Sequence, residues 1–187
     1  MKHLCNRSSL LSAAFFALIF CLPPGRALAD TAATIDSKSR AALTSLYNTN
    51  IQARDLGHSA AAVLVFPDIV KAGFLFSGYH GEGALLAGKK TLGHYRTTST
   101  GFGLEAGIKQ YSYALFFVDK AALEHLHKHG GWELGSDPTI VLANKGKTIS
   151  GTTTHLKGGS YVVFFNQKGL MAGASVQGSK ITQIQPE

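Results

Sequence analysis

The chain has 187 residues, of which 45% are hydrophobic and 16% are charged, and its formal net charge is +7 with neutral histidines. An apolar content this high with so few charges excludes a disordered chain, and the length suits one domain. The 2 cysteines are too few for a disulfide scaffold or a zinc ribbon.

The first 29 residues have the pattern of a secretory signal peptide. Lys2 and Arg7 give a positive start, residues 10–22 are apolar, and the small residues Ala27 and Ala29 precede Asp30. We therefore predict cleavage between Ala29 and Asp30 and a periplasmic or secreted protein. Lipidation of the chain is the alternative at this end. It is disfavoured because Phe20, and not a small residue, stands before Cys21.

Cleavage would leave residues 30–187 as a single domain without cysteine, which excludes disulfides and thiol catalysis. The formal charge would fall to +4, because three basic residues leave with the signal peptide. This excess permits attraction to an anionic surface but is too small to predict nucleic-acid binding. No apolar run of 18 residues occurs in this part, so we expect no transmembrane segment in the mature protein.

Helical periodicity occurs in two regions, the N-terminal part of the mature chain and a segment that follows Asp119. Apolar residues recur at helical spacing from Ile35, with Asp36 as the expected N-cap, and a second piece covers residues 51–60. Together they predict N-terminal helices over about 34–60. A third helix is expected between Asp119 and His129, where two glycines stop it.

The rest of the mature chain, residues 62–186, is rich in β-strand patterns and glycine. Residues 30–187 hold 20 glycines, which inside strands indicate sharp coiling, bulges or close strand crossings. We predict an α+β fold, with a curved, glycine-rich antiparallel sheet or small barrel and a few flanking helices. The expected strands are Ala62–Pro67, Ala72–Tyr79, Gly83–Ala87, Thr91–Thr97, Gly101–Ile108, Tyr111–Val118, Thr139–Ala143, Ser160–Asn166, Gly169–Gln177 and Lys180–Ile184.

Two short motifs occur twice. GLEAG at 103–107 is similar to GLMAG at 169–173, and YALFF at 113–117 is similar to YVVFF at 161–165. Their order reverses between the copies, which predicts paired hairpins of similar build and not a tandem repeat. The runs with Tyr113 and Tyr161 are apolar on both faces and should therefore lie centrally in the sheet.

No catalytic or cofactor motif survives inspection, so we predict neither enzyme activity nor a cofactor. The sequence GALLAGKK at 83–90 fails as a phosphate-binding loop because Lys90 occupies the position of the magnesium ligand. His125 and His129 lie one helical turn apart and could hold a metal ion with a third ligand. The simpler explanation is that histidines favour the last turn of a helix.

Four separated blocks resemble the SYLF lipid-binding domain family, whose C-terminal part is also named as an actin-binding domain in yeast members. The blocks are AAVLVFPDIVKAGFLFSGYHGEGALL (61–86), TTSTGFGLEAGIKQYSYALFFVD (97–119), GWELGSDPTIVL (131–142) and VVFFNQKGLMAGASVQGSKI (162–181). The resemblance implies a non-enzymatic domain of helices and a curved sheet that binds phospholipid head groups. Carried over by position, it implies lipid contacts by Lys71, Lys168 and Lys180.

The sequence therefore predicts adsorption to anionic phospholipid, or to another amphiphile of the cell envelope, through basic side chains. An envelope scaffolding module that binds protein or polymer is the first alternative, with the protein partner unidentified. A metal-binding protein that uses the histidine-rich helix is the second.

Overall fold

The computed structural model describes residues 30–127, 132–133, 139–143 and 159–187, and the predicted signal peptide with Ala29 lies outside this part. Three helices are described, α2 (Ala32–Thr49), α3 (Ile51–Ser59) and α4 (Lys120–Leu126). The strands are β1 (Ala62–Ala87), β2 (Lys90–Phe117), β3 (Trp132–Glu133), β4 (Thr139–Ala143) and β5 (Ser160–Ile184).

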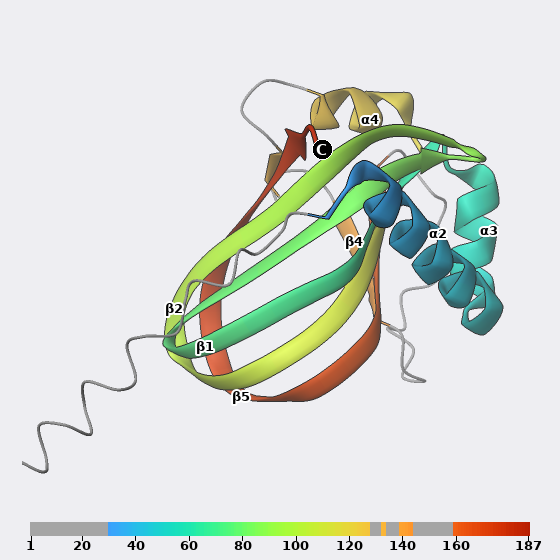
Figure 1. Cartoon of the computed structure of the whole chain (residues 1–187). Helices are drawn as coiled ribbons and strands as arrows, with labels where there is room; N and C mark the ends of the chain where they lie inside the picture. Colours follow the sequence, from blue (N-terminus) through green and yellow to red (C-terminus); the bar gives the residue numbers. More distant parts are fainter. Residues whose placement is uncertain (1–29, 128–131, 134–138, 144–158) are drawn as a thin grey trace, which may run out of the picture.

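The strands form one sheet in the order β1-β2-β5-β3, and β4 also pairs with β5 (Figure 1). The pairs β1–β2, β2–β5 and β3–β5 are antiparallel, whereas β4 runs parallel to β5. Among the described strands, β1 pairs only with β2, so the sheet stays open at this edge. The α+β prediction is confirmed, in the form of a curved sheet.

The first helix begins earlier than the sequence predicts, and Asp36 as its N-cap is wrong. Thr31 caps α2, because its side chain accepts a hydrogen bond from the Thr34 amide. Asp36 instead faces the sheet, where its carboxylate accepts a hydrogen bond from Thr91 at 3.0 Å and lies 2.9 Å from His94 Nε2. These contacts fasten α2 to the start of β2.

Most of the short strands expected from the sequence merge into β1, β2 and β5, which have 26, 28 and 25 residues. Glycines do not end the strands but bend them, because pairing of β1 with β2 continues past each one with only local register shifts. Pro67, expected to end the first strand, lies at one such shift between Phe66 and Ile69.

The repeated motifs pair with each other across β2 and β5. Ala106 of GLEAG pairs with Ala172 of GLMAG, and Ala114 of YALFF pairs with Val163 of YVVFF. Antiparallel pairing explains why the order of the motifs reverses. The expectation of two similar hairpins is wrong, because the two copies of each motif pair with each other in the single β2–β5 ladder.

The three long strands form a ribbon that folds back on itself (Figure 1). We call residues 62–72, 108–117 and 160–170 the first arm, residues 78–87, 90–100 and 179–184 the second arm, and the parts between them the bend. At the bend, a Cβ on Gly73 would lie 2.6 Å from the Cβ of Ser77, so the chain turns too sharply there for a side chain. The bend lies at the end of the ribbon away from α2 and α3.

The arms come closest where β1 passes itself. A Cβ on Gly81 would lie 2.8 Å from the Asp68 carbonyl oxygen, and one on Gly83 would lie 2.9 Å from the Val65 carbonyl carbon. Real side chains do not approach backbone atoms so closely, so glycine is required at both positions. This confirms the expected close strand crossing.

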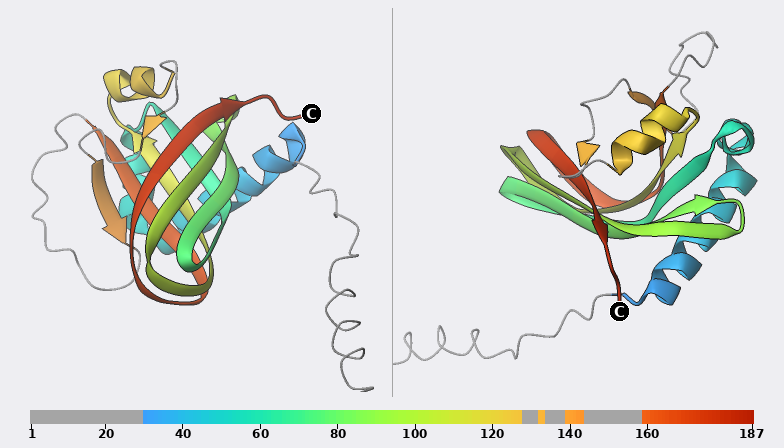
Figure 2. Two further views of the ribbon diagram at one scale, coloured as in Figure 1. Left: turned by 90° about the vertical axis from the view of Figure 1, so that its left-hand side faces the viewer. Right: turned by 90° about the horizontal axis from the view of Figure 1, so that it is seen from above.

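Two apolar clusters fill the two faces of the sheet near the helices. Leu64, Phe66 and Leu115 pack on the face that meets α4, together with Leu126 of that helix. Val65 and Phe116 belong to the opposite face, which α2 and α3 cover. Figure 2 shows α4 on one side of the sheet and α2 with α3 on the other. The prediction that these runs are central and apolar on both faces is confirmed.

Replacement of Gly83 by alanine tests the strand crossing. The added methyl group would collide with the Val65 carbonyl, so we expect a loss of about 3 kcal/mol in the free energy of unfolding. The control is Gly93→Ala, whose new Cβ would meet the Gln183 and Tyr95 side chains, each at 3.3 Å, and not a backbone atom. Chemical denaturation measures both variants, and equal stabilities would show that the arms do not meet at Gly83.

Candidate functional site

The structure brings two of the three predicted lysines into neighbouring rungs of the first arm. Lys71 of β1 pairs directly with Lys109 of β2, and Gln110 pairs with Lys168 of β5. Like charges directly opposite each other across two strands repel, so this pairing concentrates positive charge at one place on the arm. Sequence reasoning missed Lys109, and only the strand register could have revealed it.

These lysines lie on both faces of the ribbon. Lys109 shares the face of Tyr111, and its Nζ lies 5.7 Å from the centre of that ring. Lys168 opposes Gln110 and therefore leaves the other face, where it is exposed. Asp68 is an acidic residue of the same arm, and its carboxylate accepts a 3.4 Å hydrogen bond from the Gln110 amide.

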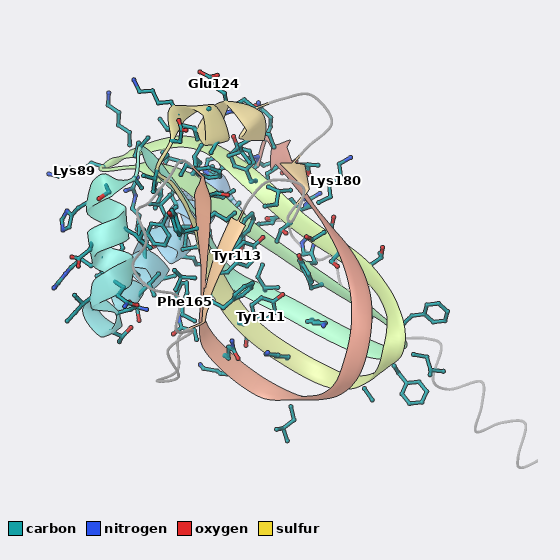
Figure 3. All side chains as sticks on the ribbon, turned by 180° about the vertical axis from the view of Figure 1, so that it is seen from behind. Lys89, Tyr111, Tyr113, Glu124, Phe165 and Lys180 are labelled. Atoms are coloured by element: carbon teal, nitrogen blue, oxygen red, sulfur yellow. The ribbon has the colours of Figure 1, made fainter. Side chains whose placement is uncertain are left out.

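Lys180 is separated from the other two. It lies on the second arm, where it pairs in register with Thr98 on one side and with Glu133 of β3 on the other. Figure 3 shows Lys180 near the end of β5 that adjoins α4, while Tyr111 and Tyr113 lie within the folded ribbon. The first arm therefore joins Lys71, Lys109 and Lys168 but not Lys180.

An exposed apolar face begins on the same arm and extends into the bend. Ala72, Ile108 and Leu170 form one rung across the three strands, and Val70 and Phe74 flank Ala72 on β1. The exposed fractions are 89% for Leu170, 76% for Phe74 and 66% for Ile108. We call these five residues the apolar outer face. It continues the face that α2 and α3 cover near Val65, beyond the reach of the helices.

The bend adds two more exposed apolar side chains on β1. Leu75 is 46% exposed and Phe76 is 72% exposed, directly after Phe74. Leu75 also has a φ of 66°, a left-handed conformation that a bulky residue adopts only at a cost. The signal for this feature is the run Phe74-Leu75-Phe76, which sequence reasoning treated as part of an ordinary strand.

Other polar groups in the described residues serve the fold. Arg96 pairs with Glu82 at 2.7 Å between neighbouring strands. Tyr113 donates a 2.9 Å hydrogen bond to Thr97, and its burial raises the pKa of its phenol well above the usual value. This bond joins the first arm to the second within the core.

The histidine-rich helix gives no support for a metal site in the described part of the chain. His129 and the side chain of His125 lie outside the described residues. His127, between them, places Nδ1 3.3 Å from the Tyr95 hydroxyl. Within the part that the structure describes, no group of three histidine, cysteine or acidic residues could hold a metal ion.

Residues 98–187 match the family model described as Ysc84, a Las17-binding protein actin regulator. The chain therefore carries a match to the Ysc84 (SYLF) domain over residues 98–187. Over 148 residues it is 31% identical to "Beta cell expansion factor A" of Aeromonas veronii, covering 78% of this chain. It is also 31% identical over 123 residues to "LAS seventeen-binding protein 3" of Saccharomyces cerevisiae, covering 62% of this chain.

A mammalian relative, "SH3 domain-containing YSC84-like protein 1" of Bos taurus, is 27% identical over 122 residues, or 62% of this chain. The match spans 54% of the Aeromonas protein, 27% of the yeast protein and 36% of the bovine protein. The chain therefore corresponds to only part of each relative.

The strained backbone at Leu75 is testable against a matched leucine. Leu92 is also 46% exposed, but it lies in β2 and is not among the residues with positive φ. Glycine adopts positive φ freely, so Leu75→Gly should cost about 1–2 kcal/mol less than Leu92→Gly in the free energy of unfolding. Chemical denaturation of both variants measures the difference, and equal costs would show that the backbone at Leu75 is not strained.

Proposed function

We propose that this SYLF protein is an exported, non-enzymatic protein that adsorbs to anionic phospholipid head groups through basic residues of its curved sheet. The observation that carries the proposal is the direct opposition of Lys71 and Lys109, with Lys168 one rung away. Three lysines on one arm concentrate positive charge, which attracts a surface of phosphates. The N-terminal pattern that ends at Ala29 supports export.

The strength of such binding follows from charge. Each lysine close to an anionic membrane contributes about 1 kcal/mol, and the contribution falls with distance over about one Debye length. Three lysines therefore give weak, salt-sensitive adsorption. Among the described residues, no helix combines the length and the apolar character that crossing a bilayer requires.

A second candidate is a module that binds another protein. The name of the yeast relative, "LAS seventeen-binding protein 3", favours this function for a SYLF protein. It predicts binding that is indifferent to the charge of a lipid surface. The two candidates therefore give opposite results in one vesicle experiment.

The experiment is co-sedimentation with vesicles of phosphatidylcholine, with and without phosphatidylglycerol. The protein is taken from the exported fraction of the host, and mass spectrometry determines whether Asp30 is its first residue. We expect binding to the anionic vesicles at low salt and release at high salt. Equal sedimentation with both kinds of vesicle would contradict the proposal.

Charge removal locates the binding surface. The triple variant Lys71→Gln, Lys109→Gln and Lys168→Gln should lose about 3 kcal/mol of binding free energy, or about a hundredfold in affinity. Its control removes the same charge at Lys89, Lys90 and Lys120, which are exposed and lie in the hairpin and α4. Equal losses in the two triples would show that only the total charge matters.

A further inference from the structure

We propose that the bend of the ribbon inserts into the bilayer when the lysines of the first arm adsorb to its head groups. The side chains that enter the bilayer are those of Phe74, Leu75 and Phe76. The proposal rests on the function proposed above and adds a second, apolar contact at a defined place. Its occupant is the interfacial region of a lipid bilayer with anionic head groups.

The exposed side chains favour a contact surface at this place. Phe74 and Phe76 are 76% and 72% exposed at adjacent outward positions around Leu75. They lie on β1, an edge strand of the described sheet, where proteins usually place charges or proline to prevent aggregation. A run of large apolar residues on such an edge indicates a surface that is covered in use.

The position of the lysines identifies the bilayer as the partner. The rung of Lys71 and Lys109 lies four residues before Leu75 along β1, which spans at most about 13 Å of chain. Apolar groups of peripheral proteins enter the membrane interface by roughly 5–10 Å. The lysines would then stand at the depth of the phosphates while the bend reaches the acyl chains.

The distribution of charge around the ribbon agrees with this orientation. Lys109 and Lys168 leave opposite faces of the first arm, so a bend pointed into the membrane would meet head groups on both sides. Thr100, the last residue of the second arm before the bend, is exposed, and polar side chains suit the head-group layer there. A second copy of the chain would bring the same lysines together, which disfavours a dimer through this surface.

The backbone at Leu75 and the placement of the helices both agree with a contact role for the bend. Leu75 keeps a large apolar side chain at a φ of 66°, where glycine would be easier to accommodate. The ribbon of Figure 1 shows that α2, α3 and α4 all lie away from this end. The described helices therefore leave the bend uncovered.

The test places an environment-sensitive fluorophore at the bend. Cys5 and Cys21 are replaced by serine, so that a cysteine introduced by Phe76→Cys is the only thiol available for labelling. We expect a blue shift of the label on anionic vesicles and quenching by lipids brominated in the acyl chains. The same label at Leu92→Cys, in the hairpin half of β2, should remain in water.

A second pair of variants keeps the proposal testable by affinity. Phe74→Ser with Phe76→Ser should lower the vesicle partition coefficient about tenfold or more, including the binding that remains at high salt. The control pair, Ile51→Ser with Leu92→Ser, removes residues that are 67% and 46% exposed elsewhere and should leave the partition coefficient unchanged. Circular dichroism checks that all four substitutions retain the fold.

The outcomes separate the two proposals. Binding to anionic vesicles without a shift at residue 76 would leave electrostatic adsorption intact and overturn insertion. An absence of binding to any vesicle would overturn both. A shift that depends on protein concentration without lipid, together with a doubled mass in light scattering, would assign the bend to a dimer and overturn insertion.

Discussion

The close passage of β1 over itself is the constraint on which the rest of the structure depends. Gly81 and Gly83 lie against the backbone from Val65 to Asp68, with no space for a side chain at either glycine. Because β2 stays paired with β1 and β5 stays paired with β2, both strands must fold over with β1. One local contact between two halves of a strand thus determines the shape of the whole ribbon.

Because of this shape, apolar residues of the same strands are buried near the helices and exposed near the bend. Near the helices both faces of the first arm are covered, so Leu64 and Val65 are fully buried on opposite sides. The apolar alternation continues past the shift at Pro67, but α2 and α3 do not extend as far. Ile108 and Leu170 consequently remain in solvent, in rungs next to the lysines. Basic and apolar groups thus meet at the end of the ribbon opposite the helices, which is the physical basis of the proposed membrane contact.

Much of the fold could be predicted from periodicity and glycine content. The helices, the β4 segment and the doubly apolar runs agree with the sequence patterns because each depends on local spacing. The merging of strands could not be predicted, since glycine and Pro67 suggest breaks locally while cross-strand pairing preserves continuity. The placement of the lysines could be predicted only in part from the sequence. Lys71, Lys109 and Lys168 come to lie in two neighbouring rungs only through the strand register.

Hydrogen–deuterium exchange with and without anionic vesicles tests the central claim most directly, because it reports on every part of the ribbon at once. The structure predicts that vesicles slow exchange in peptides covering 70–76 of β1, with no change in the hairpin around Lys89 or in α3. Protection confined to α2 and α3, with exchange at 70–76 unchanged, would contradict the claim that the bend is the membrane-facing end.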